Sequence, residues 1–199
     1  MHTLEKLPGW NPTPPALESR DETLLEGRIL RFVRRVYRAG DAEHGWEMAS
    51  RRGTAGIVAC LPVTAAGEAV FLSQWRVPLE RGVIEIVAGI VEPGESAEEA
   101  LVRELSEEAG LVAGSLRKVA DFTTSAGLTD EVIATYVAEG CVPDPAARHS
   151  GEAAEVIEVF PVPLARAWDW LHDRAREGLV DPKTFALLAI VLHERRDGR

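Results

Sequence analysis

The stretch from residue 88 to residue 111 constrains this chain more than any other part of it. It reads AGIVEPGESAEEALVRELSEEAGL, and three of its carboxylates fall at Glu104, Glu107 and Glu108. On a helix, residues three and four positions apart are neighbours, so these three side chains would share one face. Like charges this close repel one another. A helix keeps such a stripe either because water screens the charges or because a cation lies on them.

Signals at both ends of this stretch favour a helix. Ser96 can act as the N-cap, and Glu99 then completes a capping box, so we interpret Glu98 and Glu99 as solvated or capping charges. Gly110 suits the left-handed residue that ends many helices, and the Glu-Pro-Gly-Glu sequence in front favours a turn. An apolar side is formed by Ala100, Leu101 and Leu105. We therefore predict a tight loop that leads into an acidic helix.

The spacing of the whole stretch is that of the Nudix box, G-x5-E-x7-R-E-U-x-E-E-x-G-U, in which U is a bulky aliphatic residue. Gly89, Glu95 and the run from Arg103 to Leu111 match every position. The sequence therefore resembles the Nudix hydrolase superfamily over about residues 22–193. The resemblance implies an α+β protein with the Nudix fold, a mixed-sheet α/β/α sandwich. We expect Arg103 and Glu95 to form a salt bridge between the loop and the helix.

The box residues point to metal-dependent hydrolysis of a pyrophosphate. Water must reach a phosphorus atom that is surrounded by negative oxygens, and Mg²⁺, or Mn²⁺ in its place, can neutralise those oxygens and acidify a bound water. Glu104 and Glu108, one turn apart, are the first candidates for metal ligands, with Glu107 beside them. The resemblance adds the backbone carbonyl of Ala88 as a ligand and implies that Glu95 completes or supports the cluster.

Two sources are left open for the general base. It is either a box glutamate that also binds the metal, among them Glu104, Glu107 and Glu108, or a glutamate of the loop between residues 139 and 155. Glu152 and Glu155 are the candidates in that loop.

Four short segments outside the box resemble the ADP-ribose pyrophosphatase subfamily: Gly-Arg-Ile-Leu at 27–30, Gln-Trp-Arg at 74–76, Glu-Ile-Val-Ala-Gly at 85–89 and Ser-Ala-Gly-Leu-Thr-Asp-Glu at 125–131. The resemblance implies a set of substrate contacts, namely Arg28, Arg52, Arg76, Gly127 and Glu131. Trp46 could stack on an adenine or simply pack.

The resemblance implies an enzyme that hydrolyses ADP-ribose to AMP and ribose 5-phosphate, or a related nucleoside diphosphate sugar. The subfamily's proline in the last segment is Ala126 here, and alanine leaves the loop freer than proline would. GDP-mannose-type sugars and dinucleotide polyphosphates are therefore kept as alternative substrates. A Nudix domain that senses a nucleotide without cleaving it is the alternative of another class. The complete set of box carboxylates favours the enzyme.

Charge and composition limit the partners. A net charge of −10 disfavours nucleic acid, which needs a basic footprint, and it would repel a pyrophosphate unless a metal reversed the local field. No apolar run reaches the roughly 18 residues of a membrane span, and the N-terminus lacks the apolar core of a secretory signal. Cys60 and Cys141 form neither a metal spacing nor a disulfide framework. We therefore expect a cytoplasmic protein with a small-molecule nucleotide substrate and no membrane partner.

Three parts are predicted along the chain. Residues 1–20 hold four prolines and are predicted to be a flexible tail. Residues 21–52 form a β-rich extension with a hairpin that turns at Gly40-Asp41, and residues 53–195 form the Nudix hydrolase domain. An isolated hairpin is marginal in water, so its apolar face needs a cover. In the resembled subfamily the N-terminal strands cross a two-fold axis, which implies a homodimer; folding back onto the same subunit is the alternative.

Within the main domain, the residue patterns predict strands interleaved with helices. Strands are expected at 56–63, 69–76, 83–87, 116–123, 131–138 and 155–160, with a loop at 139–154. Helices are expected at 163–177 and from Asp181-Pro182, an N-cap followed by a first-turn proline, to about His193.

Overall fold

The computed structural model describes residues 18–147 and 156–198, and the chain divides into two compact units. The first unit comprises Met1–Arg52 and Gly127–Asp130, and the second comprises Gly53–Ala126 and Glu131–Arg199. Glu152 and Glu155, the two glutamates that the sequence offers as loop bases, lie outside the described residues.

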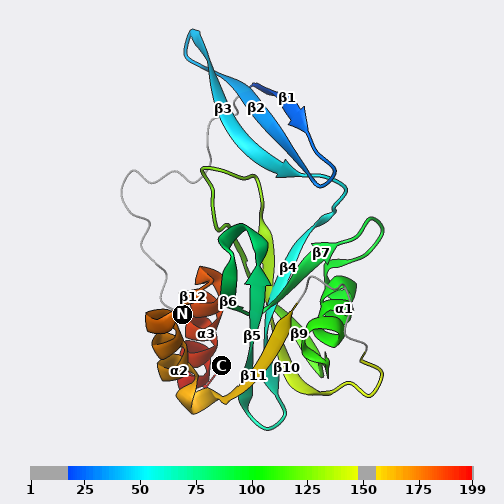
Figure 1. Cartoon of the computed structure of the whole chain (residues 1–199), viewed down its shortest axis with the longest axis vertical. Helices are drawn as coiled ribbons and strands as arrows, with labels where there is room; N and C mark the ends of the chain where they lie inside the picture. The colour runs from blue at the N-terminus through cyan, green and yellow to red at the C-terminus, as the bar shows by residue number, and fades with distance from the viewer. Residues whose placement is uncertain (1–17, 148–155, 199) are drawn as a thin grey trace. The chain divides into compact units, whose positions relative to one another are not determined.

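The first unit is built on a three-stranded antiparallel sheet in the order β1-β2-β3 (Figure 1). Its strands are β1 (Ser19–Glu26), β2 (Leu30–Ala39) and β3 (Ala42–Arg51). The hairpin turn predicted at Gly40-Asp41 is confirmed, because Ala39 pairs with Ala42 and Gly40 adopts a positive φ of 64°.

Strand β1 precedes the predicted hairpin, and it begins two residues before the predicted start of the β-rich extension. Its sequence, SRDETLLE, has little apolar alternation. Charge pairs across the sheet hold it instead: Asp21 lies opposite Arg35 and accepts two hydrogen bonds from it, at 2.7 and 2.9 Å. Arg20 reaches Glu43 at 3.0 Å.

The second unit contains a nine-stranded mixed sheet with the order β12-β6-β5-β4-β10-β8, to which β11, β7 and β9 are added beside β5, β4 and β10. The pairs β4–β10 and β6–β12 are parallel and the other pairs are antiparallel. The strands are β4 (Gly56–Thr64), β5 (Glu68–Arg76), β6 (Arg81–Glu85), β7 (Val87–Val91), β8 (Leu111–Val112), β9 (Ser115–Phe122), β10 (Ile133–Pro143), β11 (Ile157–Pro163) and β12 (Leu179–Val180). A short 3-10 turn, Val77–Leu79, follows β5.

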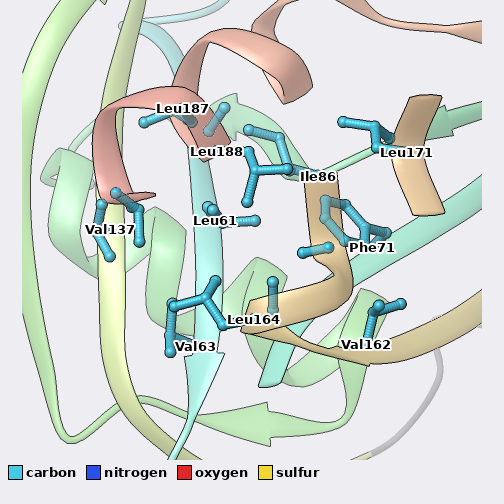
Figure 2. Close-up of a cluster of buried hydrophobic side chains, with 14 of the residues drawn as sticks. Leu61, Val63, Phe71, Ile86, Val137, Val162, Leu164, Leu171, Leu187 and Leu188 are labelled. Atoms are coloured by element: carbon cyan, nitrogen blue, oxygen red, sulfur yellow. The ribbon is translucent and has the colours of Figure 1, made fainter. Parts of the chain in front are cut away.

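Three helices cover this sheet: α1 (Ala97–Ala109), α2 (Leu164–Glu177) and α3 (Pro182–Arg196). Alternate residues of the central strands point to opposite faces. Leu61 and Phe71 join the core under α2 and α3, where Leu171 and Leu187 pack on them (Figure 2). Their neighbours Cys60 and Leu72 join a second core with Leu101 and Leu105 of α1. The predicted α/β/α sandwich is confirmed.

Two strand predictions need correction. The strand predicted at 83–87 is in fact two strands that separate at Ile86, because the chain leaves the edge of β5 at Glu85 and joins β4 from Val87 onward. The loop predicted from residue 139 begins later, because β10 continues to Pro143. An irregularity at Gly140, with φ 63°, allows β10 to go on pairing, and Val142 and Pro143 pair with β8. Within the described residues, no helix combines the length and apolar character that would let it cross a membrane.

Candidate active site

The acidic helix α1 is anchored at both ends as its sequence predicts. The Ser96 hydroxyl accepts a hydrogen bond from the Glu99 amide at 3.2 Å, and the Glu99 carboxylate accepts one from the Ser96 amide at 2.8 Å. These contacts hold the pKa of Glu99 below its usual value. Gly110 ends the helix in the left-handed conformation, with φ 64°. The predicted capping box is therefore confirmed, and it sets where the helix begins.

The box glycine lies where the carboxylate of Glu104 meets strand β7. A Cβ on Gly89 would fall on the carboxylate of Glu104, so no other residue type leaves that carboxylate where it is. Gly89 has no positive φ and pairs with Val58 of β4 as an ordinary strand residue. The need for glycine here is therefore one of space and not of backbone conformation.

Glu108 is turned to the same strand. The residue is only 8% exposed, and its carboxylate oxygen Oε2 accepts a hydrogen bond from the Ala88 amide at 3.1 Å. A buried carboxylate needs such a partner, because losing water without replacement is costly. Two carboxylates one helical turn apart thus lie at the main chain of residues 88 and 89.

Arg103 forms hydrogen bonds with three carboxylates of the box. Its guanidinium donates to Glu95 at 3.1 and 3.2 Å, to Glu104 at 2.7 Å and to Glu107 at 3.3 Å, and also to the Ile90 carbonyl at 3.0 Å. The predicted salt bridge to Glu95 is confirmed. The hydrogen bond from Arg103, with one from the Glu92 amide, lowers the pKa of Glu95. The pKa of Arg103 is raised, first by its bond to Glu95.

The donor set fits a hard divalent cation. Among the described residues, no group of three or more His, Cys, Asp or Glu side chains is already drawn together as metal ligands. Arg103 lies between Glu95, Glu104 and Glu107 and bonds to each of these carboxylates, which would otherwise repel one another. Carboxylate and main-chain carbonyl oxygens are the ligands that Mg²⁺ takes in proteins. Glu104, Glu108 and the carbonyl of Ala88 carry oxygens of this kind, on one helix and one strand.

Of the predicted substrate contacts, two belong to the second unit. Arg76 ends β5 and is held by the buried Glu85 through two hydrogen bonds, from Nε to Oε1 at 2.5 Å and from Nη2 to Oε2 at 2.6 Å. The pKa of Arg76 is raised, first by this hydrogen bond and, among smaller effects, by the charge of Glu108. Arg76 therefore lies within electrostatic reach of the acidic cluster. Glu131 is half-buried and precedes β10.

The other three predicted contacts belong to the first unit. Arg28 is exposed in the connection between β1 and β2. Arg52 is tied into that connection, donating to the Gly27 carbonyl at 2.7 Å and pairing with Glu26 at 2.7 Å. Gly127 accepts a hydrogen bond from the indole nitrogen of Trp46 at 3.1 Å. Trp46 is about half exposed, so this bond positions the loop that contains Gly127 while the ring keeps an exposed surface.

The loop that contains Gly127 is bound along β3 over three residues. The Ala49 amide donates to the Leu128 carbonyl at 2.8 Å, and Ser50 donates from its hydroxyl to Asp130 at 2.9 Å. Ala49 and Thr129 form a short parallel bridge. The segment predicted to be a substrate loop is therefore shaped by the N-terminal extension rather than by a proline of its own.

A charged residue that the sequence did not single out also contacts Glu85, the partner of Arg76. Lys183 of α3 is 7% exposed and donates to Glu85 at 3.3 Å and to Asp181 at 2.7 Å. The only sequence signal near it was the N-cap and proline of the helix start. Because its partner Glu85 is 98 residues away in the chain, no short sequence pattern marks Lys183 as part of an ion pair.

Comparison with known proteins gives a consistent family. The NUDIX domain model matches residues 53–180. Over 140 residues the chain is 38% identical to an ADP-ribose pyrophosphatase of Bacillus subtilis (strain 168), which covers 70% of this chain and 74% of that protein. Over 124 residues it is 33% identical to a methanol dehydrogenase activator of Bacillus methanolicus, which covers 61% of this chain and 64% of that protein. The crystal structure of an ADP compounds hydrolase shares the fold, with a TM-score of 0.73 at 21% identity over 92% of this chain and 96% of that chain.

Proposed function

The chain belongs to the NUDIX family, and from this we propose that it is a divalent-metal-dependent pyrophosphatase that hydrolyses ADP-ribose, or a related nucleoside diphosphate sugar. With ADP-ribose the products would be AMP and ribose 5-phosphate. The relative from Bacillus subtilis is an ADP-ribose pyrophosphatase and supports this substrate. The short segments around Arg76 and Gly127 support it as well.

One observation carries the catalytic part of the proposal. The carboxylate of Glu104 fills the space next to Gly89 that a side chain would need, and Glu108 is bound to the amide of the preceding residue, Ala88. A solvated acidic helix would have no reason to turn two carboxylates inward against a strand. This arrangement favours a cation site over the alternative in which water alone screens the charges.

Mg²⁺, or Mn²⁺ in its place, would be held by Glu104, Glu108 and the Ala88 carbonyl, where it would neutralise phosphate oxygens and acidify a water. Glu95 supports this cluster by fixing Arg103, which in turn limits where Glu104 and Glu107 can lie. The reaction adds water to one phosphorus of the anhydride and breaks the bond to the bridging oxygen. The proton of the water passes to a carboxylate.

The residue that accepts this proton is proposed from two groups. Within the box, Glu107 is half-buried at the edge of the cluster, beside Glu104 and Glu108. Outside it, Glu152 and Glu155 follow β10 in the chain. Arg28, Arg52, Arg76, Gly127 and Glu131 are proposed to contact the substrate.

A substrate panel tests the activity. ADP-ribose, GDP-mannose and a dinucleotide polyphosphate are incubated with the protein and Mg²⁺ or Mn²⁺, and the products are separated by chromatography. We expect AMP and ribose 5-phosphate from ADP-ribose, loss of activity in excess EDTA and recovery when Mg²⁺ is restored. Faster hydrolysis of another substrate would replace ADP-ribose as the proposed substrate. Binding without cleavage would indicate a sensor, and full activity in excess EDTA would rule out the metal mechanism.

We also propose that the protein is a homodimer with two-fold symmetry, formed through the N-terminal extension of residues 21–52. The first unit exposes large apolar side chains for its size, among them Leu25 at 71%, Ile29 at 50% and Phe32 at 41%. A small sheet with such a surface needs a cover.

Light scattering at micromolar concentration tests the assembly. We expect twice the chain mass of 21.7 kDa for the natural protein and a single chain mass for Phe32→Glu. Val112→Glu, an equally exposed position in the second unit, is the matched control and should remain dimeric. A natural protein of single mass with full activity would refute the dimer.

Burial of the cysteines and the net charge support the location and the excluded partners that we propose. Cys60 and Cys141 are buried free thiols, and burial raises the pKa of Cys60 and brings that of Cys141 to about 11. Such thiols are unreactive and suit the reducing cytoplasm that we propose. The net charge of −10 supports a nucleotide substrate handled through a metal and no nucleic-acid partner.

A further inference from the structure

Lys183 is the most deeply buried charged amine among the described residues. It lies in the first turn of α3, and its residue is 7% exposed. An ammonium group this deep is stable only with charged partners. It has two, Asp181 at 2.7 Å and Glu85 at 3.3 Å, and Glu85 is itself only 3% exposed.

Glu85 is shared between Lys183 and Arg76. Arg76 uses one edge of its guanidinium, Nε and Nη2, to hold both oxygens of Glu85. Nη1 takes no part in these two hydrogen bonds, and the Arg76 side chain is still 40% exposed. A planar fork fixed along one edge is well suited to bind a phosphate with the other.

The charges of this group balance. Arg76 and Lys183 are positive, and Glu85 and Asp181 are negative. The charge of Asp181 also acts on Arg76, where it contributes to the raised pKa of the guanidinium. Without Lys183, the carboxylates of Glu85 and Asp181 would compete for the Arg76 guanidinium. The position in which Nε and Nη2 of Arg76 bind Glu85 would then no longer be the most favourable one for this guanidinium.

The backbone holds this group rigidly. The Asp181 amide donates to the Ile84 carbonyl at 2.9 Å, and β12 pairs in parallel with β6 just before it. The Asp181 side chain caps α3 by accepting from the Lys183 amide at 2.9 Å. Lys183 is thus fixed to the strand that carries Glu85, so its charge stays in place.

We propose that Lys183 is a positioning residue for the substrate: it neutralises Asp181 so that Glu85 holds Arg76 with its free edge turned to a phosphate. The inference rests on the proposed function, in which Arg76 contacts the pyrophosphate. It adds a substrate-positioning role for helix α3, which lies outside the residues of the box.

Steady-state kinetics with ADP-ribose tests this role. We expect Lys183→Met to raise KM about tenfold and to change kcat by less than about threefold, by analogy with the outer partners of metal ligands, whose loss typically costs about 10-fold to 100-fold. Lys183→Arg should recover most of the affinity. Lys118→Met, which removes an exposed lysine paired with Asp121, is the control and should leave KM unchanged.

A charge-balanced variant separates positioning from mere damage to the fold. Asp181→Asn keeps the helix cap but removes the charge that Lys183 neutralises. The double variant Asp181→Asn/Lys183→Met should therefore return KM to within about threefold of the natural value. If Lys183 only supported the fold, the double variant would be no better than Lys183→Met, and the proposal would be overturned.

An Arg76→Gln background distinguishes this inference from the proposed function. Arg76→Gln should raise KM, and adding Lys183→Met should then have no further effect, because both act through one guanidinium. A raised KM in Arg76→Gln together with an unchanged KM in Lys183→Met would overturn the inference alone. An unchanged KM in Arg76→Gln would remove Arg76 from the substrate contacts, and the inference with it.

Discussion

Glu104→Gln and Glu108→Gln are each expected to lower kcat about 100-fold or more while the protein stays folded. Glutamine keeps the shape of the side chain but loses the charge that a divalent cation needs. Even the mutation of an outer partner of a metal ligand typically lowers metal affinity or activity about 10-fold to 100-fold. Steady-state kinetics with saturating Mg²⁺ gives kcat. Far-UV circular dichroism and the melting temperature report whether the fold is retained.

Glu99→Gln is the matched control for these two variants. It lies on the same helix, but it is exposed and its carboxylate serves the capping box. A glutamine there still accepts the bond from the Ser96 amide, so we expect near-natural kcat and a small change in melting temperature. If Glu99→Gln lost as much kcat as Glu104→Gln, the assignment of the helix faces would be wrong.

The parts of the molecule that sequence predicts well are those set by short spacings. The capping box of Ser96 and Glu99, the left-handed Gly110 and the shared helix face of Glu104 and Glu108 all follow from positions within one helix. The fold class follows too, because the continuous apolar runs of β4 and β5, which are buried on both faces, serve two cores at once. These features depend on neighbours in the chain, and the chain shows them directly.

The parts that sequence misses depend on partners far apart in the chain. Strand β1 is held by pairs such as Asp21 with Arg35, and a polar sequence gives no apolar alternation to mark it. The break at Ile86 exists because the chain changes partner strands there, while its apolar run is continuous. Lys183 looked like an ordinary first-turn residue because Glu85 is distant in sequence. Only the tertiary arrangement brings these groups together.

Gly89→Ala is expected to lower kcat about as much as Glu104→Gln, with the melting temperature near its natural value. Gly89 is an ordinary strand residue without positive φ, so alanine meets no backbone strain. Its methyl group would instead fall on the Glu104 carboxylate, which is the free end of a flexible side chain and would rotate away. The protein would keep its fold and lose the position of one metal ligand. Gly82→Ala on β6, where a Cβ would meet only the Ser73 hydroxyl at 3.3 Å, is the control and should keep its activity.

The double variant Gly89→Ala/Glu104→Gln tests the reason for that loss. If the methyl group acts only by displacing the Glu104 carboxylate, adding it to a protein that already lacks this charge should change kcat by less than about threefold, whereas independent effects would multiply. Kinetics on the two single variants and the double variant complete the cycle. Full kcat in Gly89→Ala would show that the carboxylate works from another position, and multiplied losses in the double variant would show that the glycine serves something other than Glu104.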